Sequence, residues 1–332
     1  ASYHMGLDFF ILDKAYVESI GAENIDWFDA SQVVGSGPYT CTNFVSGASA
    51  TYEKRSDYWG LAYGYDDPYK KITATQYSDA TTMAIDLEAG NVDLALNLSV
   101  LDYDRLAANT GDNIETVLVN SNVVYVLAYD LNNNEYLKDI KVRQAISHAI
   151  NVEELTQAVA GTYGTPAKGI LGEKEIGFIE GTTWSYDPEL SKSLLEEAGY
   201  KDGDISLHMA VIGTEPYTTI CEVLQAYLAD VGITLDFEPL EMMAFISNGS
   251  TPGFTDLQIY TMMGGNPNAD PYIHLDNWYS DSTSPVMART AEYDELLNAG
   301  ATTLDTAKRQ EIYGQLSQLW YDNCDAIGLY EW

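Results

Sequence analysis

Basic residues and cysteines are scarce in this chain of 332 residues. Sixteen lysines and arginines stand against 50 aspartates and glutamates, which gives a formal net charge of −34. A surface of this sign repels nucleic acids and anionic lipid headgroups, so we expect neither as a partner. The three cysteines (Cys41, Cys221 and Cys324) are too widely spaced for a disulfide framework or a zinc site. They allow one bridge, between Cys221 and Cys324, but favour three buried thiols.

Long apolar runs and catalytic motifs are also missing. No run of 18 or more apolar residues occurs, so we expect no membrane-spanning helix. The first residues lack the basic and apolar start of a signal peptide, as a mature chain also would. The four histidines (His4, His148, His208 and His274) share no metal-ligand spacing, and no nucleophile elbow, HExxH sequence or phosphate loop is present. The sequence therefore predicts no enzyme, no cofactor and no metal site; a hydrolase with an acidic surface is the enzymatic alternative.

The clearest pattern in the sequence lies in residues 137–171. Apolar residues between positions 140 and 150 recur at helical spacing, which predicts a helix with one apolar face. Asn151 offers a side-chain oxygen to cap a second helix over 152–160, which carries two glutamates in its first turn. We expect a compact pair of short helices without catalytic residues.

Strand and helix patterns alternate through much of the chain, which predicts sheets covered by helices. An alternating segment over 92–98 is expected to be a strand, and a β-branched and aromatic run over 122–131 a central strand. The other expected strands are 39–44, 49–54, 72–76, 205–212, 233–238, 256–263 and 327–330. The other expected helices are 14–20, 80–89, 187–198, a long helix from Pro216, 242–246, 293–301 and 306–323.

The loop after the strand 256–263 is the main binding-site candidate. In open α/β sheets, ligands bind beyond the carboxyl ends of the strands. The sequence there is Gly-Gly-Asn-Pro-Asn-Ala-Asp-Pro. Glycines let a ligand approach the backbone closely, and asparagine side chains both donate and accept hydrogen bonds.

Several long motifs resemble the extracellular solute-binding proteins of ABC transporters, in the subfamily of dipeptide-, oligopeptide- and nickel-binding proteins. The resemblance extends from about Gln32 to Tyr330. Its motifs include Leu137-Lys138-Asp139, Val142-Arg143-Gln144-Ala145-Ile146, Gly164-Thr165-Pro166-Ala167, Gly37-Pro38-Tyr39, Asp57-Tyr58-Trp59-Gly60, Asp187-Pro188 and Val231-Gly232-Ile233.

The resemblance implies an α/β fold of the bilobal periplasmic-binding-protein type (type II, cluster C), with two mixed-sheet lobes joined by a hinge. It divides the chain near Tyr129, into a partial lobe I (residues 1–129) and lobe II (residues 130–332), with the loop 264–271 facing the ligand. Family members carry a longer segment before the Gly-Pro-Tyr motif and a return to the first lobe after the final strand. Lobe I is therefore expected to be incomplete.

The resemblance also adds residues to the candidate ligand site. Tyrosines of the central strand can contact a ligand from the hinge, although an aromatic residue in a strand is more often part of the core. In the family, the turn after the strand that corresponds to 92–98 reaches the ligand cleft. The alternative is that this turn is an ordinary loop between a strand and a helix. In peptide-binding relatives an aspartate binds the peptide's α-ammonium group, and here Pro267 occupies the matching position. The candidate ligand-binding residues are Met263, Gly264, Gly265, Asn266, Asn268, Asp270, Tyr125, Tyr129, Asn97 and Leu98.

In function, the resemblance implies the substrate-binding component of an ABC importer, which captures a small solute by lobe closure and delivers it to the permease. A peptide is the expected solute. An oligosaccharide is an alternative, because the chain has 25 tyrosines and 6 tryptophans that can stack on sugars. A nickel or metal-chelate receptor and a structural or adhesive surface fragment are further alternatives. We expect a monomer that is periplasmic or a cell-surface lipoprotein.

Overall fold

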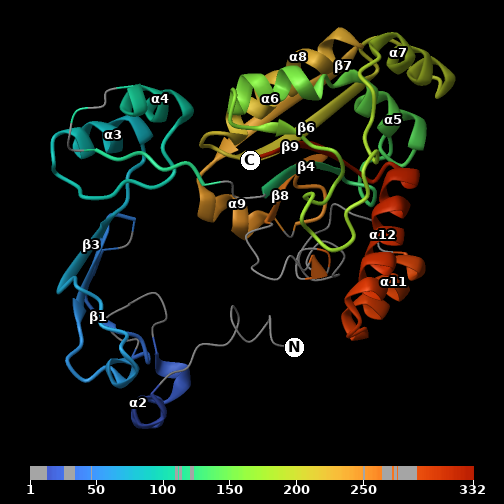
Figure 1. Cartoon of the computed structure of the whole chain (residues 1–332). Coiled ribbons are helices and arrows are strands. Elements are labelled where there is room, and N and C mark those ends of the chain that lie inside the picture. The colour runs from blue at the N-terminus through green and yellow to red at the C-terminus, as the bar shows by residue number, and fades with distance from the viewer. Residues whose placement is uncertain are drawn as a thin grey trace. The chain divides into compact units, whose positions relative to one another are not determined.

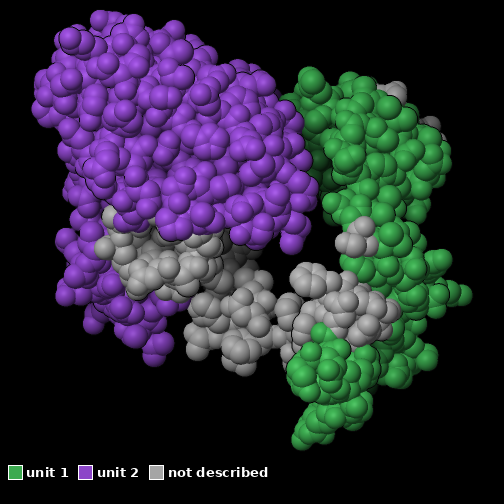
Figure 2. Space-filling model, turned by 180° about the vertical axis from the view of Figure 1, so that it is seen from behind, with its two compact units in different colours: residues 1–117 green, residues 118–332 purple. Residues whose placement is uncertain are grey.

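The computed structural model describes residues 13–25, 34–45, 47–108, 111, 114–119, 123–249, 251–263, 271–272, 275 and 290–332. The chain forms two compact units, residues 1–117 and residues 118–332, which we call unit 1 and unit 2 (Figure 2). The expected lobe boundary near Tyr129 lies at the end of strand β4 (Val123–Tyr129), which belongs to unit 2. The assignment of lobes to these units stays a prediction.

Unit 1 is built around a three-stranded antiparallel sheet in the order β1-β2-β3. The two strands expected over 39–44 and 49–54 form a hairpin, and they are joined by a tight turn that includes Gly47 at a φ of 68°. The elements of unit 1 are α2 (Lys14–Ile20), η1 (Ala22–Asn24), β1 (Tyr39–Val45), β2 (Ser49–Lys54), η3 (Trp59–Tyr63), β3 (Lys71–Thr75), α3 (Ala80–Glu88) and α4 (Val100–Ala108).

The predicted strand over 92–98 is wrong, because the structure has no strand there. Its apolar side chains point to solvent: Leu94 and Leu96 are 73% and 66% exposed. Asn97 has a positive φ of 58°, which breaks an extended run. An alternating pattern forms a strand only where a neighbouring strand completes the hydrogen-bond ladder, and no described strand pairs with this segment.

Unit 2 contains a four-stranded sheet in the order β5-β9-β4-β8 and a parallel pair, β6 and β7. Its strands are β4, β5 (Thr165–Pro166), β6 (Ile205–Ile212), β7 (Ile233–Leu240), β8 (Leu257–Met263) and β9 (Ala326–Glu331). β4 lies between β9 and β8 and is antiparallel to both. Its alternate residues enter two different core clusters, with Val126 on one face and Leu127 on the other. Burial on both faces explains why β4 reads as a continuous apolar run.

Helices cover both faces of the unit 2 sheet (Figure 1). Residues of α5, α6 and α8 pack in one core cluster, and residues of α11 and α12 pack in the other. The Asn151 side chain caps α6 as expected, by accepting a hydrogen bond from the Glu154 N–H. The helices of unit 2 are α5 (Ile140–Ala149), α6 (Val152–Ala160), α7 (Pro188–Glu197), α8 (Tyr217–Asp230), α9 (Met242–Asn248), α11 (Ala291–Thr302) and α12 (Thr306–Asn323).

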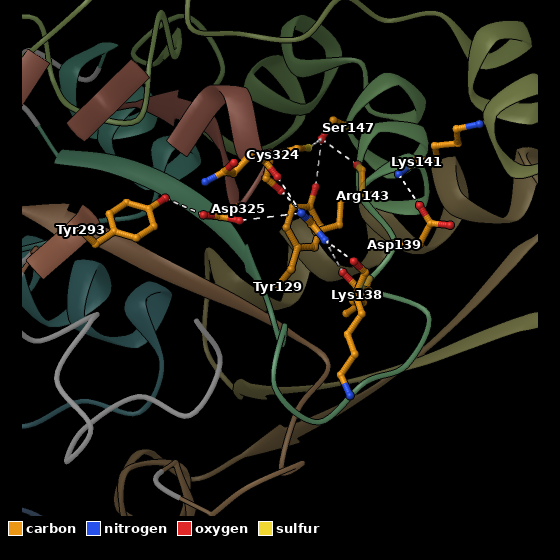
Figure 3. A network of polar contacts seen from close by, with 11 residues as sticks. Tyr129, Lys138, Asp139, Lys141, Arg143, Ser147, Tyr293, Cys324 and Asp325 are labelled. Atoms are coloured by element: carbon orange, nitrogen blue, oxygen red, sulfur yellow. Dashed lines mark hydrogen bonds and ion pairs between the residues drawn. The ribbon is translucent and has the colours of Figure 1, made fainter. Parts of the chain in front are cut away.

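A buried arginine joins α5 to the end of α12 (Figure 3). The Arg143 guanidinium donates to the carbonyl oxygens of Leu137 and Lys138 at 2.6 and 3.1 Å. It also donates to the carbonyls of Asn323 and Cys324 at 2.7 and 3.0 Å. The last carbonyls of a helix have no partner within the helix, so Arg143 supplies donors where α12 ends.

The same network extends to a buried carboxylate. Asp325 lies 3.9 Å from the Arg143 guanidinium and accepts a 2.5 Å hydrogen bond from the Tyr293 hydroxyl. Burial raises the pKa of Asp325, and the Tyr293 hydrogen bond and the Arg143 charge oppose that rise. The network therefore fixes the start of β9 against both α5 and α11.

All three cysteines are free thiols, so the bridge between Cys221 and Cys324 does not form. Two of them are buried, as the sequence favours, while Cys41 is partly exposed. Burial raises the pKa of Cys221 and of Cys324 to about 12. The buried thiols therefore stay protonated and unreactive at neutral pH.

Candidate functional site

The expected ligand loop lies largely outside the residues that the structure describes. This holds for Gly264, Gly265, Asn266, Asn268 and Asp270, and for Pro267. Met263 is the last residue of β8, and the register of that strand shows where the loop begins.

Several strand ends of unit 2 lie together at the point where β8 ends. The backbone of Met263 pairs with Val123 at the start of β4, and the end of β9 pairs with the same part of β4. The Tyr125 ring contacts the ring of Tyr217, which begins α8 directly after β6. Figure 1 shows the C-terminus at this end of the sheet. We call this region, formed by residues 123–125, 212–219, 263 and 330–332, the carboxyl edge.

Four aromatic side chains meet at the carboxyl edge, and we call them the aromatic cluster: Tyr125, Tyr217, Tyr330 and Trp332. The Tyr125 and Tyr330 rings are stacked, with centroids 4.5 Å apart and an interplanar angle of 6°. Tyr217 lies 6.1 Å from Tyr125, and Trp332 lies edge-on to Tyr330 at 6.4 Å. Tyr330 is fully buried, whereas the other three rings are half-buried. The cluster therefore combines a rigid stacked pair with two partly exposed rings.

The electrostatics of the aromatic cluster are those of neutral phenols beside a carboxylate. Burial raises the pKa of Tyr125, Tyr217 and Tyr330, so all three hydroxyls stay protonated at neutral pH. The Glu215 carboxylate contributes to the rise at Tyr330.

The exposed carboxylate of Glu215 is held in place by two hydroxyl groups of α8. Thr218 donates to one oxygen at 3.0 Å and Thr219 to the other at 2.6 Å. Pro216, the residue before α8, provides no side-chain cap. The Glu215 side chain therefore lies beside the N-terminus of α8, which is the positive end of the helix dipole.

The other described candidates do not belong to the aromatic cluster. Tyr129 is fully buried and its hydroxyl lies 3.0 Å from Ser147 Oγ, which corresponds to the core alternative for this residue. Asn97 is exposed, Leu98 is half-buried, and both belong to unit 1. Tyr125 is thus the candidate whose described side chain lies at the carboxyl edge.

Sequence reasoning missed Tyr217, Tyr330, Trp332 and Glu215. Glu215 lies between β6 and α8, Tyr217 begins α8, and Tyr330 and Trp332 lie at the end of β9, which is far from β4 in the sequence. The pairing of Tyr125 with Tyr330 across β4 and β9 brings the two strand ends together, and the ring contact between Tyr125 and Tyr217 adds the start of α8. The one local signal was that Glu215 and Tyr217 follow the carboxyl end of β6, where ligands bind in open sheets.

A small cavity lies elsewhere in unit 2, between α6 and β9. Its volume is about 70 Å³ and its lining includes Val152, Trp184 and Gly328. A cavity of this size has room for a few water molecules. It is therefore not a site for a peptide or a sugar.

Within the described residues, histidine, cysteine and carboxylate side chains form no group of three or more that is suited to a metal ion. The described helices also include none with the length and apolar character needed to cross a bilayer.

Comparison with known proteins identifies the family. The family model for the middle part of bacterial extracellular solute-binding proteins, family 5, matches residues 3–285. Heme-binding protein A of Haemophilus influenzae is 26% identical over 94% of this chain, and the dipeptide-binding protein of Escherichia coli is 25% identical over 96%.

Solved structures show the same fold. The dipeptide-binding protein of a Pseudoalteromonas species, in complex with Met-Leu, has a TM-score of 0.83 at 22% identity, over 96% of this chain and 63% of that protein. This chain spans 57% of the Haemophilus protein and 59% of the Escherichia coli protein. The match of more than half of the chain to the family model, together with this shared fold, shows that the chain belongs to family 5 of the bacterial extracellular solute-binding proteins.

Proposed function

We propose that this chain captures a small solute, most simply a peptide, for an ABC importer. The observation that carries the proposal is the family match over residues 3–285. Among the relatives, one binds dipeptides and another was solved with the dipeptide Met-Leu. The proposal does not assign catalysis to the chain, because its relatives are binding proteins.

The carboxyl edge supports solute capture by its chemistry. Half-buried aromatic rings offer apolar surface that stays near solvent, as in ligand sites with a few polar groups among aromatic side chains. Met263, the last residue of β8, lies at the same edge, and it directly precedes the predicted ligand loop 264–271. We propose that the ligand contacts this loop and the aromatic cluster, with Tyr125 common to the sequence-based and structural assignments.

The remaining parts of the proposal concern partners and location. We propose that the chain works with ABC permease subunits as a monomer, outside the cytoplasm, in the periplasm or as a lipoprotein at the cell surface. The strongly acidic surface, with a net charge of −34, fits a protein that does not bind nucleic acid.

One observation favours an oligosaccharide as the solute. Unit 1 exposes four aromatic side chains within a short segment: Trp59 (59%), Tyr63 (74%), Tyr65 (66%) and Tyr69 (66%). Exposed aromatic rings present flat apolar faces beside polar groups, which suits stacking on sugar rings. A sugar receptor is therefore the second candidate.

A thermal-shift screen tests the proposed function. We expect a mixture of di- and tripeptides to raise the unfolding midpoint of the chain, because a ligand that binds only the folded state stabilises it. At a hundred times the dissociation constant the gain is about 2.7 kcal/mol, or roughly 5–10 °C for a unit of this size. Oligosaccharides, haem and nickel salts form the comparison arms. A shift with sugars alone would replace the peptide by a sugar, and no shift with any arm at millimolar concentration would contradict solute capture by this chain.

A further inference from the structure

We propose that residues 58–69 of unit 1 dock onto the surface of a membrane that contains anionic phospholipids. We call this segment the aromatic loop. Its exposed apolar side chains are Trp59, Leu61, Tyr63, Tyr65 and Tyr69. The inference goes beyond the proposed function, because it concerns the surface on which the protein works and does not depend on which solute is captured.

The aromatic loop is folded, so its side chains are held in position at the surface. It includes the 3-10 helix η3, which ends at Gly64 with a φ of 83° in the left-handed region. The Tyr65 N–H donates to the carbonyl oxygen of Gly60 at 3.0 Å, and Lys54 of β2 forms an ion pair with Asp66. A segment that is already ordered loses little conformational freedom when it docks.

Trp59 and Tyr63 form an exposed aromatic pair in this loop. The Trp59 Nε1–H donates to the Ser36 carbonyl oxygen at 3.0 Å, yet the residue is 59% exposed. The Tyr63 ring lies edge-on to it, with centroids 6.0 Å apart, and this residue is 74% exposed. Because the Trp59 N–H is already paired, the ring can enter an apolar layer without an unpaired donor. Tryptophan and tyrosine are also the residues that gather where a membrane meets water.

The charge around the aromatic loop differs from that of the whole chain. Residues 54–71 contain four basic and three acidic residues, for a net charge of +1, whereas the chain carries −34. Lys54 and Arg55 form ion pairs with aspartates of this segment, and Lys70 and Lys71 are exposed. At physiological ionic strength, exposed charges more than about 8 Å apart are largely screened. The repulsion of anionic lipids expected from the net charge applies to the average surface, and this segment departs from it.

The polar groups of the aromatic loop favour a membrane over a sugar. A sugar site needs polar side chains beside its aromatic rings to bind hydroxyl groups. Apart from the tyrosines, the polar side chains of the loop are Asp66 and Asp67. Both are engaged within the protein, Asp66 by Lys54 and Asp67 by the Tyr69 N–H at 2.9 Å. The rings that suit a sugar therefore suit a membrane surface better.

The lysines beside the loop favour a membrane over a protein partner. Protein interfaces are enriched in tryptophan and tyrosine but depleted of lysine. Segments that lie on membranes combine aromatic side chains with lysines, which reach the lipid phosphates. Lys70 and Lys71 directly follow the aromatic loop, so both kinds of side chain are present in one short segment.

Co-sedimentation of the full chain with lipid vesicles tests the inference. Vesicles of phosphatidylcholine alone are compared with vesicles that also contain phosphatidylglycerol, and the neutral oligosaccharide cellohexaose forms a separate arm. We expect binding to the mixed vesicles that weakens as salt is added, because salt screens the lysines. No binding to the mixed vesicles would overturn the inference, and binding of cellohexaose in its place would assign the rings to a sugar.

A double substitution locates the contact in the aromatic loop. We expect Trp59→Ser with Tyr63→Ser to lower the vesicle partition coefficient at least tenfold, which corresponds to about 1.4 kcal/mol. The matched control is Leu101→Ser with Leu304→Ser, which removes two apolar side chains that are 81% and 98% exposed outside the loop. The control is expected to bind as the parent does, and equal losses in the two variants would contradict docking through the loop.

A second pair of variants tests the lysines and leaves the rings in place. We expect Lys70→Gln with Lys71→Gln to weaken binding to the mixed vesicles at least tenfold, since each lysine near an anionic surface contributes roughly fivefold. Lys201→Gln with Lys308→Gln removes two exposed lysines of unit 2 and changes the net charge equally. This control is expected to bind as the parent does. Equal effects of the two variants would show that the charge of the whole chain controls binding, and the inference would be wrong.

The outcomes separate this inference from the proposed function. Solute binding without vesicle binding contradicts membrane docking and leaves the proposed function intact. Vesicle binding without any solute-dependent thermal shift contradicts the proposed function and leaves membrane docking intact.

Discussion

The variant Arg143→Met is expected to lose about 3–5 kcal/mol of unfolding free energy, because it leaves a buried carboxylate unpaired. The Arg143 side chain is 7% exposed, and it donates to four backbone carbonyls besides its ion pair with Asp325. Methionine fills a similar volume but donates nothing, so the carbonyls at the end of α12 lose their partners. Urea denaturation followed by circular dichroism measures the loss.

Lys141→Met is the control for this prediction. Lys141 lies on the same helix, and its ion pair with Glu197 is exposed on both sides. Exposed pairs of this kind contribute about 0–1 kcal/mol, so the control is expected to unfold almost as the parent does. Similar losses in the two variants would show that the Arg143 network (Figure 3) does not hold α12 to α5. Restoration of stability by Asp325→Asn in the Arg143→Met background would support the role of the unpaired charge.

Gly328→Ala is the second substitution with a large expected effect. A Cβ at this position would lie 2.2 Å from the carbonyl oxygen of Gly169 and 2.9 Å from the Cβ of Ala167. The first of these neighbours is backbone, and β9 is held by β4 on one side and β5 on the other, so the strand has little room to shift. We expect a loss of about 3 kcal/mol, at the upper end of the range for overpacking. Thermal and urea unfolding would both report it.

Gly314→Ala is a control for which we expect a gain in stability instead of a loss. Gly314 lies inside α12, and a Cβ there would meet Ile179 at 3.4 Å, an ordinary contact distance. Alanine in a helix interior is favoured over glycine by about 0.5–1 kcal/mol, so this variant is expected to gain stability. A loss in Gly314→Ala as large as that in Gly328→Ala would show that the packing around these glycines is not as the structure describes.

Local signals in the sequence predicted most elements of the fold. The bounds of α6 were predicted residue for residue, because Asn151 caps the helix and Gly161 follows its end. The prediction of a strand over 92–98 was wrong because an alternating pattern indicates two faces but does not supply a partner strand. Helix signals are contained within one segment, whereas strands depend on residues that are distant in the sequence.

The candidate site was only partly predictable for the same reason. Tyr125 was recognisable from the sequence as an aromatic residue on a central strand. The stacking of Tyr125 on Tyr330 depends on the register of β4 and β9, which no local pattern fixes. Glu215 was one of 50 acidic residues, and only its hydrogen bonds to Thr218 and Thr219 distinguish it from the others.

The position of β9 in the sheet also determines when unit 2 can fold during synthesis. Leu127 of β4 pairs with Ile327 of β9, which the ribosome adds 200 residues later. At a synthesis rate of about 5–20 residues per second, roughly 10–40 seconds pass between the synthesis of β4 and that of β9. During that interval one side of an apolar strand has no partner, and pairings of such high contact order form slowly even when both strands are present. The sheet of unit 2 therefore stays open until β9 has been synthesised, and chaperones that bind extended apolar segments have that time to engage the chain.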